Sequence, residues 1–243
     1  MNFEIGFFPV VFVVLILYLA VVAPVAGYIE HKKLKQNLAD GLNKKLSVYR
    51  HTILWSWIPV MVIILLIPFS ELTLYGLGFR WINLKASSLS YWIVIPTITL
   101  FFLYLLYNVY SIILLKTNQK ARFEASQNLP EYVKALLPIT NQEKRTWVYV
   151  AFSAGITEEI VYRGYLFFAL GVLFPSLSVF LILLISTFLF GLGHVYQGKE
   201  MVKPTVLGLF FGFSYILFDS LIPIIILHVA QDLVVTYLLE KEE

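Results

Sequence analysis

The stretch Gly155-Ile-Thr-Glu-Glu-Ile-Val-Tyr-Arg-Gly164 places three ionisable side chains in the middle of apolar sequence. Apolar residues flank it at 147–152 and 165–174, so the whole segment is long enough to cross a bilayer. The three side chains are Glu158, Glu159 and Arg163. On insertion scales a charged side chain at the bilayer centre costs about 2.5–3.5 kcal/mol, so such groups persist mainly where they face a protein interior and serve a function. The stretch therefore predicts a membrane helix with a polar site inside the bilayer.

The composition of the whole chain is that of a membrane protein. Of its 243 residues, 59% are hydrophobic and only 14% are charged. Soluble domains carry roughly 45–50% apolar residues. The 20 Phe and 15 Tyr residues suit contact with lipid and with the membrane interface. The net charge of +3 is distributed as topology signals are, so we expect no nucleic-acid partner. Cysteine is absent, which excludes disulfides and thiolate metal sites.

Apolar runs predict an all-α, polytopic transmembrane helical bundle with about seven spans. An eighth span would follow if the third run were broken. The predicted spans cover residues 5–28, 52–69, 91–115, 176–194, 204–218 and 220–239, together with a fourth and longest helix that starts at 140, within the polar loop 116–145, and runs to 174. No repeat, low-complexity segment or flexible linker divides the sequence. We therefore expect residues 1–243 to form a single membrane domain.

Four local signals add detail to this outline. Thr140-Asn-Gln-Glu143 has the spacing of a capping box, which predicts that the fourth and longest helix starts there. Residues 129–137 are expected to form a short amphipathic helix on the membrane surface. Gly208 and Gly212 have the Gly-x-x-x-Gly spacing of closely packed membrane helices. Asp219, in the short turn between the last two spans, is expected to be solvated.

The positive-inside rule orients the chain. With seven spans and the N-terminus outside, all but three of the 18 Lys and Arg residues lie on the cytoplasmic side or in the C-terminal tail. The exceptions are Arg80 and Lys85 in an outer loop and Arg163 within the membrane. The C-terminus is therefore expected to be cytoplasmic. We expect a multi-pass protein of a cell membrane, most simply a bacterial plasma membrane.

The two adjacent glutamates are expected to differ in role. Glu159 and Arg163 are four residues apart with the acid first, the order that favours an ion pair on a helix. Glu158 is offset by about 100° around the helix axis and lacks this partner, which makes it the candidate general base. The alternative is that all three side chains belong to a structural ion-pair network.

Two later spans each carry a histidine in apolar sequence. In Phe190-Gly-Leu-Gly-His194, the two named side chains share a helix face, and the glycines allow a neighbouring helix or a substrate to approach closely. His228 and Asp232 are again four residues apart. Either histidine could instead be a hydrogen-bond partner between helices. At 1.5 Å per residue, Glu158 and His228 lie about 12 and 11 residues, or about 18 and 16 Å, from the cytoplasmic ends of their membrane-crossing segments. With His194 nearer that side, the three can meet in a cavity open to the cytoplasm.

Together these motifs resemble the signature of the CPBP family of intramembrane proteases, also called Abi. This family includes the CAAX prenyl endopeptidases and bacteriocin-immunity-type members. The motifs are Glu158-Glu159-x-x-x-Arg163, Phe190-x-x-x-His194 and His228-x-x-x-Asp232. The resemblance covers residues 145–239. It implies a catalytic core over 141–239, preceded by N-terminal helices and a cytoplasmic loop over 1–140.

The resemblance also implies roles. Glu158 and His194 would activate the attacking water, and His228 with Asp232 would stabilise the oxyanion or orient the site. Glu159, Arg163 and Phe190 would support them. No cofactor is required on this mechanism, but Glu158, His194 and His228 could also ligate Zn²⁺ with an open position for water. Position 232 is commonly Asn in the family. An ionised Asp232 cannot donate to an oxyanion, so it would instead fix the tautomer of His228 or serve as a ligand.

The function predicted by this resemblance is an intramembrane endopeptidase acting on a membrane-associated or lipidated peptide or protein within the lipid bilayer. Prenylated tails, peptide pheromones, bacteriocins and signalling proteins are all compatible substrates, and no oligomeric state is predicted. One alternative is an ion-coupled transporter that uses the same residues to relay protons, although paired broken helices and inverted halves are absent from the sequence. The other is a non-catalytic membrane partner, such as an immunity protein.

Overall fold

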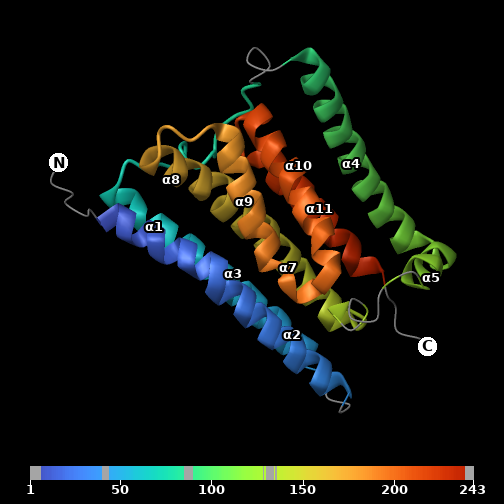
Figure 1. Ribbon diagram of the computed structural model, residues 1–243. Coiled ribbons are helices and arrows are strands. Elements are labelled where there is room, and N and C mark those ends of the chain that lie inside the picture. Colours follow the sequence, from blue (N-terminus) through green and yellow to red (C-terminus); the bar gives the residue numbers. More distant parts are fainter. Residues whose placement is uncertain are drawn as a thin grey trace. The chain divides into compact units, whose positions relative to one another are not determined.

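The computed structural model describes residues 7–39, 44–84, 90–127, 129, 134 and 136–238. Within these ranges the regular secondary structure is entirely helical, which confirms the predicted all-α fold (Figure 1). In this described part, the helical segments long and apolar enough to cross a membrane are Phe7–Asn37, Lys45–Phe69, Tyr91–Thr117 and Val195–Phe218. Val179–Gly193 and Ile222–Tyr237 are shorter apolar helices. The protein is therefore a polytopic helical membrane protein, and the count of seven spans stays a prediction.

The chain divides into two compact units, each assembled from distant parts of the sequence. The first unit comprises Met1–His31, Ile58–Lys85 and Glu158–Ile224. The second unit comprises Lys32–Trp57, Ala86–Thr157 and Ile225–Glu243. The single membrane domain and its boundary near residue 140 stay predictions.

In the first unit, α9 (Val179–Gly193) packs against α8 (Leu166–Leu173) and α10 (Val202–Phe218) (Figure 1). Glycines permit this close packing. A Cβ atom at Gly191 would lie 2.5 Å from the Thr205 hydroxyl oxygen of α10, and one at Gly212 would overlap Leu183 of α9. The predicted roles of Gly191 and of the Gly-x-x-x-Gly spacing in helix packing are therefore confirmed.

The N-terminal helix is longer than its apolar run. α1 (Phe7–Leu17) continues through a π-helical turn, η1 (Tyr18–Val22), into α2 (Ala23–Ala39). The predicted span ended at Tyr28, but the helix continues because the following residues are mostly Lys, Leu, Glu and Gln, which favour helix. His31 therefore lies on a helix, three residues beyond the end of the predicted span.

The fourth predicted span is a continuous helix with one irregular turn. α7 (Asn141–Glu159) starts at the predicted capping box. The Thr140 amide donates to the Glu143 carboxylate at 2.9 Å, and the Glu143 amide donates to the Thr140 hydroxyl at 3.2 Å. After Glu159 the chain makes a π-helical turn, η4 (Ile160–Tyr165), and continues into α8. Such turns are frequent at functional sites. The amphipathic helix predicted over 129–137 falls largely outside the described residues.

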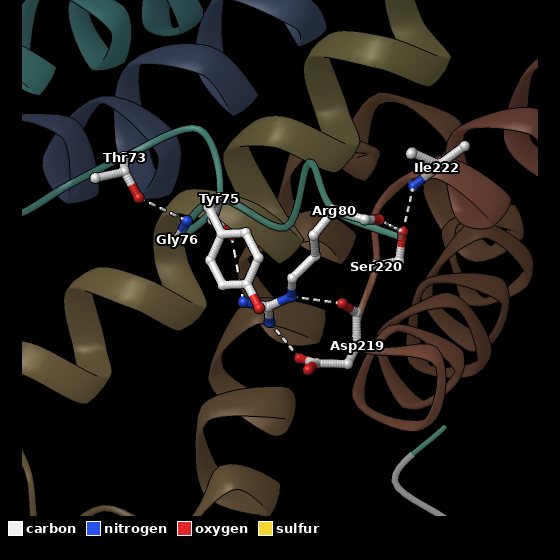
Figure 2. Close-up of polar contacts among 7 residues, drawn as sticks. All are labelled: Thr73, Tyr75, Gly76, Arg80, Asp219, Ser220 and Ile222. Atoms are coloured by element: carbon white, nitrogen blue, oxygen red, sulfur yellow. Dashed lines mark hydrogen bonds and ion pairs between the residues drawn. The ribbon is translucent and has the colours of Figure 1, made fainter. Parts of the chain in front are cut away.

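A loop of the first unit is tied to the turn that follows α10 (Figure 2). The loop follows α3 (Lys45–Leu66) and η2 (Ile67–Phe69). Arg80 Nε donates to the Asp219 carbonyl at 2.6 Å, and the guanidinium also forms an ion pair with the Asp219 carboxylate. Ser220 Oγ donates to the Arg80 carbonyl at 2.6 Å. The prediction that Asp219 is solvated was wrong, because only 19% of its side chain is exposed and its partner lies 139 residues earlier in the chain.

Two glycines let this loop come close to the helices. Gly78 has a φ of +96°, a conformation that favours glycine, and its carbonyl accepts from the Leu221 amide at 2.8 Å. A Cβ atom at Gly164 of η4 would lie only 2.7 Å from the Leu77 carbonyl oxygen. The loop is therefore fitted against both η4 and the turn after α10.

In the second unit, the greater part of α11 (Ile222–Val234) is held by α4 (Tyr91–Thr117) and α7. Tyr104 Oη of α4 donates to Gln231 Oε1 at 2.9 Å. A Cβ atom at Gly155 of α7 would lie 2.6 Å from the Val229 side chain, so these helices are in close contact. Other helices with residues here are the C-terminal part of α2, α3, which begins in this unit, and α5 (Gln119–Gln127), which follows α4.

Candidate active site

The predicted site residues fall in both units of the structure. Glu158, Glu159, Arg163, Phe190 and His194 belong to the first unit, and His228 and Asp232 belong to the second. Convergence of the two groups in one cavity stays a prediction.

The ion pair predicted between Glu159 and Arg163 is confirmed. Arg163 Nη1 donates to Glu159 Oε1 at 2.9 Å, and the two side chains are 1% and 0% exposed. Arg163 Nη2 also donates to the Gly208 carbonyl of α10 at 2.8 Å. Its guanidinium lies 4.6 Å from the centre of the Phe190 ring. Burying two charges is costly unless further hydrogen bonds satisfy them, and these contacts supply that satisfaction for the arginine. The pair therefore ties η4 to α9 and α10.

Glu158 has a different environment from its neighbour. It lies on the last turn of α7 and is only half-buried, whereas Glu159 is fully buried. Tyr162, four residues later on η4, lies within electrostatic reach of the Glu158 carboxylate. The Tyr162 ring meets Phe190 edge-on, with centroids 5.1 Å apart. Glu158 thus stands at the accessible edge of a tightly packed group.

His194 is held in one orientation at the end of α9. Its Nδ1 lies 2.9 Å from the Phe190 carbonyl oxygen. Because a carbonyl can only accept, Nδ1 carries a proton, and in the neutral imidazole Nε2 therefore carries the lone pair. The imidazole also lies 4.7 Å from the Phe190 ring, measured between centroids. Nε2 is therefore the atom that can take a proton from water or ligate a metal.

Tyr196 contacts His194, and His31 lies behind Tyr196; neither was among the predicted site residues. The Tyr196 ring stacks on His194 with centroids 6.2 Å apart and planes inclined by 27°. His31 of α2 contacts Tyr196 in turn, at 5.5 Å between centroids. Tyr196 follows the motif histidine by two residues, which was a usable signal. His31 gave none, because only folding brings α2 to this place.

In the second unit, His228 and Asp232 lie close together on α11, as their spacing predicted. His228 Nε2 and Asp232 Oδ2 are 3.8 Å apart, which is within reach of an ion pair but too long for a hydrogen bond. His228 is buried, whereas Asp232 is half-buried. Trp147 Nε1 of α7 donates to the Asp232 carbonyl at 3.1 Å and fixes this end of α11. The tautomer-fixing role of Asp232 stays a prediction.

Residues 141–234 match the protein family described as type II CAAX prenyl endopeptidase, Rce1-like. The matched segment contains all three motifs of the candidate site. These residues form a domain of that family. The CAAX endopeptidase domain begins at the first residue of α7 and ends at the last residue of α11. The family is one of proteases, so its members act on a protein or peptide. No curated protein and no solved structure matches the chain.

The CAAX endopeptidase domain supplies both candidate catalytic histidines and all the candidate carboxylates. Among the described residues, no group of three or more His, Asp or Glu side chains is gathered as a metal-binding cluster. His31 lies outside the matched segment, although its ring reaches the neighbourhood of His194 through Tyr196. The surroundings of His194 therefore extend beyond the matched domain.

Proposed function

We propose that this protein is an intramembrane endopeptidase that hydrolyses a peptide bond of a membrane-associated or lipidated peptide or protein. The observation that carries the proposal is the orientation of His194, whose Nδ1 donates to the Phe190 carbonyl and leaves Nε2 as the basic nitrogen. Tyr162 and His194 both contact Phe190, and the candidate base Glu158 precedes Tyr162 by four residues along the helix. Membership of residues 141–234 in a protease family supports the same conclusion.

In the proposed mechanism, Glu158 acts with His194 on a water molecule. They remove a proton from the water as its oxygen adds to the carbonyl carbon of the substrate. The carbonyl oxygen becomes an oxyanion, which His228 stabilises with Asp232 beside it. When the intermediate collapses, the carbon–nitrogen bond breaks and the stored proton passes to the leaving amine. Glu159 and Arg163 hold the helices that present these groups.

The same residues have donor chemistry that suits zinc. Glu158, His194 and His228 offer one carboxylate oxygen and two imidazole nitrogens, a set typical of catalytic zinc sites with an open position for water. When bound, zinc would lower the pKa of that water and polarise the substrate carbonyl. The role proposed for Glu158 as a base does not require it. Activity after exhaustive chelation, followed by addition of zinc alone, separates the two mechanisms.

The proposed topology has seven spans, with the N-terminus outside and the C-terminus in the cytoplasm. The distribution of Lys and Arg supports it, because most of them lie in the loops that this topology assigns to the cytoplasm. The site would then open toward the cytoplasm. Substrate would reach it laterally from the bilayer of a bacterial plasma membrane.

The Glu158→Gln variant tests the proposed function with the cell's own membrane proteins as candidate substrates. Membrane fractions from cells that carry the normal protein or the variant are compared for new peptide termini by mass spectrometry. We expect termini that depend on the normal protein and fall by at least about 100-fold in the variant, which is the usual contribution of a general base. The variant should reach the membrane at normal abundance, because Gln has nearly the same size.

Glu124→Gln is the matched control, since it makes the same chemical change on α5 where the side chain is 64% exposed. It should leave every terminus unchanged. Termini that persist in the Glu158→Gln membranes would remove Glu158 from the mechanism. Movement of a solute by the purified protein in liposomes, with no peptide cleaved, would instead favour a transporter.

A further inference from the structure

The CAAX endopeptidase domain contains His194, but part of the packing around this residue comes from outside the domain. His194 follows the last residue of α9, so its ring is not set by a continuing helix. One side chain that contacts it is Phe190, from the domain's own motif. A second is Tyr196, from the 3₁₀ segment η5 (Val195–Met201). The orientation of the imidazole therefore depends on where Tyr196 is held.

Tyr196 is held by α2. Its ring packs over Gly27, where a Cβ atom would lie 3.7 Å from Tyr196 Cδ1. One turn later on the same face of α2, the His31 ring lies 5.5 Å from the Tyr196 ring. The Tyr196 ring thus packs over α2 at Gly27, and His31 forms the wall beside it. The Tyr196 hydroxyl accepts from Gln197 Nε2 at 3.2 Å, which fixes the other end of the ring.

A histidine is an unusual residue to pack against the Tyr196 ring. Both of its ring nitrogens are buried, on a helix whose neighbouring positions 32 and 33 carry exposed lysines. Its ring plane is inclined by 48° to Tyr196, and the Tyr196 plane is nearly parallel to that of His194. Three rings from two distant segments thus form a continuous column that ends on the candidate catalytic imidazole.

We propose that His31 is a positioning residue for His194 and acts through Tyr196. The His31 ring limits rotation of the Tyr196 ring. The Tyr196 ring in turn limits rotation of the His194 ring, which is otherwise held by the hydrogen bond from its Nδ1 to the Phe190 carbonyl. Loss of the His31 ring lets Tyr196 tilt into the vacated space. His194 then loses its single orientation and with it the defined tautomer that presents Nε2. The functional consequence rests on the proposed endopeptidase activity, whereas the effect on His194 does not.

The chain contains only four histidines, so their imidazoles can be observed one at a time. Protein labelled with ¹⁵N in its histidine rings is measured by nuclear magnetic resonance in detergent, and each signal is assigned by a single substitution. In the normal chain we expect His194 to show the tautomer protonated at Nδ1. His31→Ala should convert this signal to a mixture of the two tautomers, whereas His31→Phe, which keeps a flat ring, should preserve it.

Two matched variants complete the measurement. His51→Ala removes an exposed histidine on α3 and should leave the His194 signal unchanged. Tyr196→Ala should reproduce the His31→Ala effect, and the double variant should show no more than Tyr196→Ala alone, because both act along one path. An unaltered His194 signal in His31→Ala overturns the proposal. A mixed signal in His51→Ala would overturn it too, since the effect would then be general loosening.

Kinetics then separate this inference from the proposed function. Cleavage of a membrane-protein extract, followed at its strongest Glu158-dependent terminus, should show a kcat about tenfold lower in His31→Ala with KM nearly unchanged. His31→Phe should restore most of that loss. If the normal chain cleaves nothing, the proposed function fails while the resonance result stands. If it cleaves and His31→Ala cleaves equally well, the positioning role fails while the proposed function stands.

Discussion

At the level of single residues, Gly208 shows how little space surrounds the buried ion pair. A Cβ atom there would lie 2.7 Å from the Phe190 ring and 3.1 Å from Arg163 Nη2. Both neighbours are buried and cannot retreat into solvent. The absence of a side chain at position 208 is therefore a requirement of the site rather than of the α10 backbone.

Gly208→Ala should consequently destabilise the protein by about 1–3 kcal/mol, the usual cost of forcing an extra methyl into a packed interior. Gly171→Ala in α8 is the matched control. Nothing lies within 4 Å of the Cβ that it adds, so it should be neutral or stabilising, as alanine favours helix over glycine. Thermal unfolding in detergent measures both. Equal melting temperatures for the two variants would contradict the packing argument.

Individual residue pairs also show which parts of the site could be predicted from the sequence. Pairs within one helix, such as Glu159 with Arg163, follow from spacing alone because the helix sets their separation. Tyr196 against His31 could not be found in this way, because α2 and η5 are far apart in the chain. Asp219 was misjudged for the same reason, since its environment is decided by Arg80 of a distant loop.

At the level of elements, the loop after α3 and the turn after α10 are joined by several polar contacts. Their contacts include the Arg80–Asp219 ion pair and the Ser220–Arg80 hydrogen bond (Figure 2). Backbone hydrogen bonds at Gly78 and Phe218 join them as well. Asp219 itself has a φ of +53°, in the left-handed region that Asp and Asn tolerate better than most residues. The turn therefore depends on Asp219 for both its charge and its backbone.

Substitution at these two positions should separate charge from backbone. Arg80→Ala removes the ion pair and the hydrogen bonds to the carbonyls of Asp219 and Tyr75, and it should cost about 1.5–3 kcal/mol. Asp219→Asn keeps the backbone preference and should cost less, while Asp219→Val should cost more than Arg80→Ala. Rates of proteolysis within the loop report the result directly. Equal costs for Asn and Val at position 219 would show that charge alone holds the turn, because both substitutions remove it.

Among the elements, the helix start at Asn141 was predictable because capping is local. The Thr140–Glu143 spacing specifies it without reference to the rest of the fold. The π-helical turn η4 was not predictable, since Ile160–Tyr165 carries no signature that distinguishes it from ordinary helix. Tertiary contacts determine its geometry, and one of them is the close approach of the Leu77 carbonyl to Gly164.

At the level of the whole molecule, the proposed topology places residues 70–84 and the 195–203 segment on opposite sides of the membrane. The chain contains no cysteine, so a single introduced cysteine can be labelled without background. Ile82→Cys, at a residue that is exposed, should react with a membrane-impermeant maleimide in intact cells. Lys199→Cys, also exposed, should react only after the cells are opened. Labelling of both positions in intact cells would contradict the proposed seven-span topology.

The turn η4 also suggests how a protein of this kind could lose its activity in evolution through a single deletion. A π-turn holds one residue more than an α-turn, so loss of a single codon within it would leave a regular helix with its hydrogen bonds intact. Every residue before the deletion would then rotate by about 100° relative to α8. Glu158 would turn away from the face where Tyr162 meets Phe190, although the helix would still insert in the bilayer. One small deletion could thus yield a descendant that keeps its architecture and its binding surfaces but performs no hydrolysis.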